Sequence, residues 1–419
     1  MSRLQFVLPT EISPKVNAAP AAPQRPRPLL CVDALRGIAA VAVMLFHANG
    51  FFWRGTQGPA VPTLLFGYGH LGVSLFFLIS GFCIHLPNAA SNRPLNWKTF
   101  AIRRFFRLYP TYLLVVVGCM LLVALQTKLV GGGPNEATWA NFAGHLIFWH
   151  YFVPANSSAM GISPVLWSIA IEVHFYVLYA LLLPVLRRVG IGRCAVLALI
   201  LGILYRLIWA RYNIHVVGAW QSLEPHRFAV ARFGEWLLGA WIAGAYAASS
   251  SQRVTAAFSG RSILISGLTL LGAVVLIDWF SSHGLGGWID IPSAFAFALI
   301  IWGWIMIERA QGVLPSPGVF LRAGKWFGDR SYSLYLVHFT AIAALGTAYA
   351  IALHVTNKDT LRGTWPLAVV AAAGIAISVF LANYLYRFVE RPSHRLARQL
   401  SKPRPDANAA RREESIDVS

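Results

Sequence analysis

Long apolar runs recur along the chain, with short polar stretches between them. A helix needs about 20 mostly apolar residues to cross the hydrocarbon core of a bilayer, and we count ten runs near that length. We therefore predict ten membrane-spanning helices, and we interpret the shorter apolar segment 142–153 as interfacial or re-entrant. The predicted spans are 34–53, 68–86, 109–130, 164–186, 194–212, 228–248, 262–280, 290–307, 331–353 and 366–388.

The composition agrees with a membrane protein. Hydrophobic residues make up 57% of the 419 residues and charged residues 12%, whereas an average soluble domain is about 25% charged. The predicted fold class is therefore all-α, a polytopic integral membrane protein. We expect residues 1–32 to form a disordered tail, residues 33–392 the transmembrane domain, and residues 393–419 a second tail. Pro392 is expected to end the last helix at the inner surface.

The positive charge follows the predicted topology. If the N-terminus is cytoplasmic, 27 of the 35 Lys and Arg residues fall in cytoplasmic segments, where these residues collect in membrane proteins. Both termini are therefore predicted to be cytoplasmic. The same distribution explains the net charge of +19, so we expect no nucleic-acid partner.

Two ionisable residues bracket ten apolar ones in the first predicted helix. Arg36 and His47 are eleven positions apart, so at about 100° per residue they share one face and lie about 16 Å apart along the axis. Ionisable groups at membrane depth are costly and are therefore functional candidates. The residues alone leave a second interpretation open, in which Arg36 anchors the topology and His47 makes a polar contact between helices.

Six motifs follow one another along residues 32–392. They are VDALRGIAAVAVMLFHA, GVSLFFLISGFCI, FAIRRFFRLYP, LWSIAIEVHFYVLYALLLP, GDRSYSLYLVH and FVERP. In this order they resemble the membrane acyltransferase family 3, whose bacterial members O-acylate polysaccharides, lipopolysaccharide, nodulation oligosaccharides and macrolides. The resemblance implies that residues 33–392 are a transmembrane acyltransferase domain.

The resemblance implies catalytic roles for Arg36 and His47, and contacts to an acyl-CoA donor for Arg104 and Arg107. Guanidinium groups suit the phosphates of coenzyme A because they offer planar bidentate donors. Arg103 belongs to the same basic run and is included in the predicted donor site. A purely topological role for these three arginines remains open, because Lys and Arg also collect on the cytoplasmic side.

Neutral histidine is the group most often used to take a proton from a reacting hydroxyl. We therefore interpret His47 as the base that activates an acceptor hydroxyl for attack on the thioester carbonyl. Glu172, deep in the predicted fourth helix, is the candidate carboxylate that orients and stabilises the protonated ring. A structural contact between helices is the alternative role for Glu172.

Other side chains in these motifs are candidates for contact with substrate. The two tyrosines and the histidine of the GDRSYSLYLVH motif are spaced by three and share one face of a helix, although such a stripe is also typical of packing. The serine of the ISGF sequence is either an acyl-accepting nucleophile or part of close helix packing. The predicted substrate contacts are Ser80, Trp167, Tyr332, Tyr335 and His338.

The sequence therefore predicts an O-acyltransferase that moves an acyl group, expected to be acetyl, from cytoplasmic acyl-CoA to a hydroxyl of a glycan or glycan-like acceptor. The expected partners are the bilayer, acyl-CoA and a carbohydrate-containing acceptor, in a bacterial cytoplasmic (inner) membrane. No metal is expected, because Glu172 and His174 are two apart and point to different faces. The alternative is a transporter or lipid-linked-sugar flippase that uses the intramembrane Arg, His and Glu groups.

Overall fold

The computed structural model describes residues 29–53, 64, 66–89, 94–130, 136–150, 163–212, 228–249, 256–311, 318–354 and 364–401. These residues form helices and no strand. The elements are α1 (Leu30–Trp53), η1 (Tyr68–Leu71), α3 (Gly72–Ala89), α4 (Trp97–Val130), α5 (Glu136–Leu146), α6 (Trp167–Val189), α7 (Ile191–Tyr212), α8 (Ala229–Ala248), α9 (Ala256–Phe280), η5 (Gly286–Ile289), α10 (Asp290–Gln311), α11 (Val319–Ala352), α12 (Trp365–Leu385), η7 (Tyr386–Glu390) and α13 (Arg391–Leu400).

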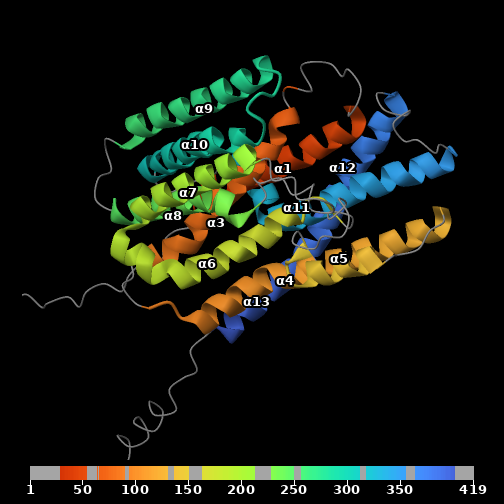
Figure 1. Ribbon diagram of the computed structural model, residues 1–419, viewed down its shortest axis with the longest axis horizontal. Coiled ribbons are helices and arrows are strands. Elements are labelled where there is room, and N and C mark those ends of the chain that lie inside the picture. Colours follow the sequence, from red (N-terminus) through yellow and green to blue (C-terminus); the bar gives the residue numbers. More distant parts are fainter. Residues whose placement is uncertain are drawn as a thin grey trace, which may run out of the picture.

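Nine helices in the described part of the chain are long and apolar enough to cross a membrane. They coincide with nine of the ten predicted spans. The tenth span corresponds to α8, which has 20 residues, carries Arg232 and Glu235, and packs on α3 and α7. The predicted all-α polytopic membrane fold is confirmed, and Figure 1 shows the long helices side by side with similar tilts.

The predicted short segment 142–153 overlaps α5 and the turn that follows it, while residues 151–153 lie outside the described residues. With 11 residues, α5 is too short to cross a bilayer. Of the two expected tails, residues 1–28 and 402–419 lie outside the described residues, whereas residues 30–32 belong to α1 and residues 393–400 to α13, so both predicted tail boundaries were wrong.

Two helices extend well beyond the apolar runs that predict them. Each of α4 and α11 has 34 residues, which is about 51 Å at 1.5 Å per residue, whereas the hydrocarbon core is about 30 Å thick. The first turns of α4 hold Arg103, Arg104 and Arg107. Arginine is a good helix former, so its charge excludes it from hydrocarbon but does not end the helix.

The prediction that Pro392 ends the last helix was wrong. A π-helical turn, η7, follows α12, and the chain continues as α13 to Leu400. Pro392 lies in the first turn of α13, directly after the π-helical turn η7, where the regular series of backbone hydrogen bonds is already interrupted. Figure 1 shows α13 alongside α4, so the residues after Pro392 belong to the packed structure.

Glycines bring the central helices close together. A Cβ on Gly37 of α1 would lie 2.1 Å from a backbone oxygen of α11, and one on Gly328 of α11 would lie 1.9 Å from a backbone oxygen of α1. Gly81 of α3 and Gly239 of α8 make equally close contacts. Small residues at such crossings are typical of helix packing in membranes. The contacts hold α11 against α1, and α8 against α3.

Four charged side chains are buried between α7, α8 and α10. Arg232 lies 2.8 Å from Glu235 and also pairs with Asp290, while Arg206 lies 3.7 Å from Asp290. Arg232 also donates a hydrogen bond of 2.8 Å to Ser74 of α3. The charges of the two cations and the two anions balance, and charged side chains are buried at an acceptable cost only when they are paired in this way. We call these four residues the ionic cluster, and it explains how α8 carries two charges inside the bundle.

The bundle has two faces. Cys83, near the end of α3, accepts a hydrogen bond from Arg36, near the start of α1, so these two helices run in opposite directions. We call the face on which α1, α4 and α11 begin the basic face, because the first turns of α4 and the last turn of α6 carry arginines there. The opposite face, where α1 ends at Trp53, is called the far face.

Candidate active site

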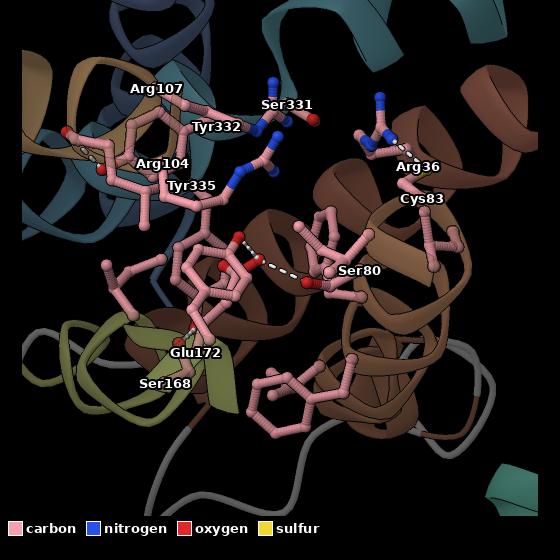
Figure 2. Close-up of a pocket in the computed structure, with 18 residues that line it drawn as sticks. Arg36, Ser80, Cys83, Arg104, Arg107, Ser168, Glu172, Ser331, Tyr332 and Tyr335 are labelled. Atoms are coloured by element: carbon pink, nitrogen blue, oxygen red, sulfur yellow. Dashed lines mark hydrogen bonds between the residues drawn. The ribbon is translucent and has the colours of Figure 1, made fainter. Parts of the chain in front are cut away.

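A cavity of about 210 Å³ lies between α1, α3, α4, α6 and α11, in the half of the bundle nearer the basic face. Its wall contains the guanidinium groups of Arg36, Arg104 and Arg107, and we call it the arginine cavity. Figure 2 shows Arg36 across the cavity from the other two arginines, with all three guanidinium groups directed into the space between them. Three cations from two helices therefore face one enclosed space.

Arg36 is held from two sides. Its guanidinium group donates hydrogen bonds of 3.3 Å to Asp33 and to the Sγ atom of Cys83. Asp33 is one turn before it on α1 and Cys83 comes from α3, so the side chain is fixed between the two helices. Among the described residues, the guanidinium group has no other side-chain partner, so its remaining N–H groups can bind a ligand in the cavity.

Glu172 is bound by hydroxyl groups inside the arginine cavity. Ser80 donates to its Oε1 atom at 2.7 Å, and Tyr176 donates to the same atom at 2.5 Å. Trp236, fully buried on α8, donates its indole N–H to Ser80 at 3.2 Å. The Ser80 hydroxyl therefore accepts from Trp236 and gives its own proton to Glu172, as Figure 2 shows for the Ser80–Glu172 contact.

The arginines of α4 also contact this network. The guanidinium group of Arg104 lies 5.6 Å from the centre of the Tyr176 ring, a cation–π contact. The charges of Glu172 and Glu390 act on Arg107, and Glu390 accepts a hydrogen bond of 2.7 Å from Ser333. The carboxylates near the cavity thus offset part of the arginine charge.

His47 is paired with His338, on the side of α1 that faces α11. The Nε2 atom of His338 lies 3.1 Å from the Nδ1 atom of His47. Each ring also contacts a backbone carbonyl one turn earlier: Nδ1 of His338 lies 3.1 Å from the oxygen of Leu334, and Nδ1 of His47 lies 2.9 Å from that of Val43. A carbonyl oxygen only accepts, so both Nδ1 atoms carry a proton.

These contacts fix the tautomers of the neutral rings. His338 carries its proton on Nδ1, so its Nε2 atom is an acceptor, and His47 donates Nδ1–H to it and to Val43. The Nε2 atom of His47 is then the unprotonated one. Within the described residues this atom has no hydrogen-bond partner, so it is available to accept a proton.

Tyr335 borders both the arginine cavity and the histidine pair. It lines the cavity, and its ring centre lies 5.6 Å from that of His338 and 5.7 Å from that of Phe76. Its hydroxyl lies 2.7 Å from that of Ser168 and donates to the backbone oxygen of Val165. Tyr335 therefore stands between the three arginines and His47.

The structure brings most of the predicted site residues together, in two groups. His47 and His338 form the pair just described. Arg103 is exposed and Trp167 half-buried at the start of α6, and neither lines the cavity. The predicted residues that line the arginine cavity are Arg36, Ser80, Arg104, Arg107, Glu172, Tyr332 and Tyr335.

The predicted contact between Glu172 and His47 is absent from the described structure. Glu172 bonds Ser80 and Tyr176, while His47 bonds Val43 and His338. The histidine partner of His47 therefore occupies the position that the sequence analysis assigned to a carboxylate. Within the described residues, no three His, Cys, Asp or Glu side chains are grouped as the ligands of a metal ion would be.

Several lining residues were missed by the sequence analysis. Cys83, Ser168 and Tyr176 line the arginine cavity, and Trp236 supports Ser80 from outside it. Tyr176 could have been found, because it lies four positions after Glu172 and so shares its helix face. Trp236 has no such signal, since its contact depends on the crossing of α3 and α8.

Comparison with known proteins identifies the family. The family model described as an acyltransferase domain matches residues 29–387. The chain belongs to this acyltransferase family. The match covers all the residues that line the arginine cavity and both histidines of the pair, and the resemblance found in the sequence motifs is confirmed.

Similar proteins come from different bacteria. Peptidoglycan O-acetyltransferase OatA of Listeria monocytogenes is 26% identical over 381 residues, which cover 86% of this chain and 55% of OatA. Nodulation protein 10 of Rhizobium leguminosarum is 26% identical, over 88% of this chain and 94% of that protein. Acyltransferase MdmB of Streptomyces mycarofaciens is 25% identical, over 92% and 96%. The chain thus spans about half the length of OatA. No solved structure matches the chain.

Proposed function

We propose that this protein is an acyl-CoA-dependent O-acyltransferase that acylates a hydroxyl of a carbohydrate or carbohydrate-containing acceptor. The observation that carries the proposal is the arginine cavity, in which Arg36, Arg104 and Arg107 face one space within a membrane-spanning bundle. Membership of the acyltransferase family supports it. So do the names of two similar proteins, a peptidoglycan O-acetyltransferase and an acyltransferase.

The chemistry of the cavity suits a CoA thioester. Coenzyme A has phosphates at one end, which guanidinium groups bind with planar, bidentate hydrogen bonds, and a long pantetheine arm that ends in the thioester. Pockets for whole drug-sized ligands have volumes of about 300–1,000 Å³, so a cavity of about 210 Å³ suits the arm better than the nucleotide. The donor would enter from the basic face, which we assign to the cytoplasm of a bacterial inner membrane.

The histidine pair suits base catalysis. In the proposed reaction the Nε2 atom of His47 takes the proton of the acceptor hydroxyl as its oxygen attacks the thioester carbonyl. A C–O bond forms, the C–S bond breaks, and the CoA thiolate leaves and takes a proton back from His47. The positive charge that develops on His47 is stabilised by the Nδ1–H hydrogen bonds to His338 and Val43, which strengthen when the donor is charged.

The arginine cavity and the histidine pair are separated by a distance that an extended donor can span. Arg36 and His47 are eleven positions apart on α1, about 16 Å along its axis. The arm must pass Tyr335 to reach the histidine pair, because this side chain borders both. Acetyl is the acyl group that we assign to the donor.

The test is product formation by purified protein in lipid nanodiscs. Acetyl-CoA labelled in the acetyl group is supplied with bacterial polysaccharide or oligosaccharide acceptors, and free CoA thiol and labelled ester are measured. We expect equal amounts of both, and no ester from His47→Ala. Uptake of labelled substrate by the same protein in sealed proteoliposomes, without release of CoA, would instead identify a transporter.

A further inference from the structure

The helix α13 brings a second group of basic side chains to the arginine cavity. It packs on α4, and the ring of His394 lies against the backbone of Arg107, a residue of the cavity wall. The charges of Arg107, Arg398 and Arg104 all act on the His394 ring. Side chains from two helices that are far apart in the sequence therefore form one positive patch. We call these four residues the α13 patch.

Two nitrogen atoms of the α13 patch are buried without a hydrogen-bond partner in the described part of the chain. They are Nε of Arg104 and Nε2 of His394. A buried polar atom without a partner has lost its hydrogen bonds to water and gained none in return, so native structures rarely keep one unless something binds it. The Nε atom of Arg104 carries a proton that it can donate to an anion, and Nε2 of His394 can donate to one when it carries the ring proton or when the ring is charged, a form that a bound anion stabilises.

The positive charge of the patch is only partly compensated. None of the ion pairs formed by the described residues involves Arg104, Arg107 or Arg398. The carboxylates that act on Arg107 are Glu172 and Glu390, and hydroxyl groups already bond both. Like charges brought this close repel one another, and a bound polyanion would relieve the repulsion.

The position of α13 suits the nucleotide part of the donor. The helix from Trp365 to Leu400 has 36 residues, about 54 Å at 1.5 Å per residue, so its last turns extend beyond a hydrocarbon core about 30 Å thick. The arginine cavity, at about 210 Å³, suits the arm better than the adenosine, which we therefore place outside it, on the basic face. The nucleotide of CoA carries a phosphate on its ribose 3′ oxygen, at the opposite end of the molecule from the thioester.

We propose that Arg398 and His394 bind the 3′-phosphate of CoA, while Arg36, Arg104 and Arg107 face the pyrophosphate and the arm. This inference rests on the proposed function, because it assigns a subsite of the same donor. It makes α13 a specificity element, since it would distinguish CoA thioesters from thioesters that lack the terminal phosphate.

The test compares two donors and two variants. Acetyl-CoA and acetyl-dephospho-CoA, which lacks only the 3′-phosphate, are assayed for KM and for direct binding. Arg398→Gln removes the charge that faces the patch, and Arg395→Gln is the matched control. Arg395 is exposed on the same helix and lies about 100° around it from His394, whereas Arg398 lies about 40° from it.

We expect Arg398→Gln to raise KM for acetyl-CoA about tenfold or more, since a hydrogen bond to a charged group contributes about 1.5–3 kcal/mol. Its KM for acetyl-dephospho-CoA should be unchanged, and Arg395→Gln should behave as wild type with both donors. Equal effects on the two donors, or no effect on either, would overturn the assignment of the 3′-phosphate.

Phosphate groups of lipids offer the same chemistry, so each assay is run in two nanodisc compositions. In the proposed arrangement, the effect of Arg398→Gln is the same in phosphatidylcholine and in phosphatidylglycerol. An effect confined to the anionic lipid would assign α13 to the membrane surface and overturn the proposal. If the wild-type protein releases no CoA from acetyl-CoA at all, the proposed function itself fails, which is a separate outcome.

Discussion

The Nε2 atom of His338 lies 3.1 Å from the Nδ1 atom of His47, although the two residues are 291 positions apart in the sequence. The contact joins α11 to α1 where α11 carries the buried His338 and α1 the half-buried His47. Because Leu334 fixes the tautomer of His338, the contact leaves Nε2 of His47 without a partner among the described residues. In the proposed mechanism, His338 is therefore a positioning residue for His47.

Replacement of His338 should lower kcat more than it changes KM. His338→Ala removes the acceptor that stabilises the protonated His47, and hydrogen bonds to charged groups contribute about 1.5–3 kcal/mol, so we expect a fall in kcat of roughly 10- to 100-fold. His338→Gln should recover part of the activity, because its amide oxygen can accept the same proton. Steady-state kinetics in nanodiscs measure both. An alanine variant with wild-type kcat would exclude a role for His338 in the reaction.

Glu172 should act independently of the histidine pair. It belongs to the arginine cavity, where Ser80 and Tyr176 bond it, and residues without shared partners usually have additive effects. We therefore expect the fold-losses of Glu172→Gln and His338→Ala in kcat/KM to multiply in the double variant. A double variant no worse than His338→Ala alone would mean that Glu172 and the pair act as one unit.

Most of the fold could be predicted because each of the nine membrane-length helices in the described part of the chain contains a continuous apolar run. The ends of helices that lie in polar sequence were harder to predict. α4 starts at Trp97, twelve residues before the predicted span, because arginine does not break a helix. Pro392 was taken as a stop, yet proline is also favoured in the first turn of a new helix, and a single sequence does not distinguish these two uses.

Less of the site could be predicted, because it is made of contacts between distant helices. The periodicity of α11 correctly put Tyr332, Tyr335 and His338 near one face, but it cannot say that Tyr335 borders the cavity while His338 meets His47. Glu172 was assigned to His47 on chemical grounds alone. Glu172 meets Ser80 because α3 crosses α6, and His47 meets His338 because α1 crosses α11.

The ionic cluster should be sensitive to the loss of one charge. Asp290→Asn leaves Arg232 and Arg206 with Glu235 as their only anionic partner in the cluster, and breaking a buried pair costs about 3–5 kcal/mol. We expect a lower midpoint of thermal unfolding in detergent. The double variant Arg232→Met/Asp290→Leu should recover stability, since replacement of both partners by apolar groups is often neutral. If the single variant unfolds as wild type does, the cluster contributes little to stability.

Two histidines that follow one another closely in the chain form a pH-sensitive contact. The rings of His145 and His150 are stacked with centres 3.7 Å apart, and both are buried beside α4. Burial lowers the pKa of His145 from about 6.5 to about 4, and it also lowers the pKa of His150. The folded state therefore favours the neutral rings.

This shift predicts that stability falls as the pH falls. Below pH 6.5 the unfolded chain binds protons that the folded chain does not, so His145 alone should cost on the order of 2 kcal/mol by pH 5. We expect faster hydrogen–deuterium exchange in α5 at pH 5 than at pH 7.5, corrected for intrinsic rates. His145→Phe, which keeps a ring but cannot be protonated, should reduce the difference. Equal exchange in wild-type protein at both pH values would contradict the prediction.

The central claim is that donor binding and proton transfer belong to separate groups of residues, the arginine cavity and His47. The most direct measurement determines acetyl-CoA binding and CoA release on the same purified His47→Ala protein. We predict a Kd for acetyl-CoA equal to that of wild type, with acceptor-dependent release of CoA slower by at least about 100-fold, as loss of a general base implies. Release of CoA by His47→Ala at the wild-type rate would contradict the account.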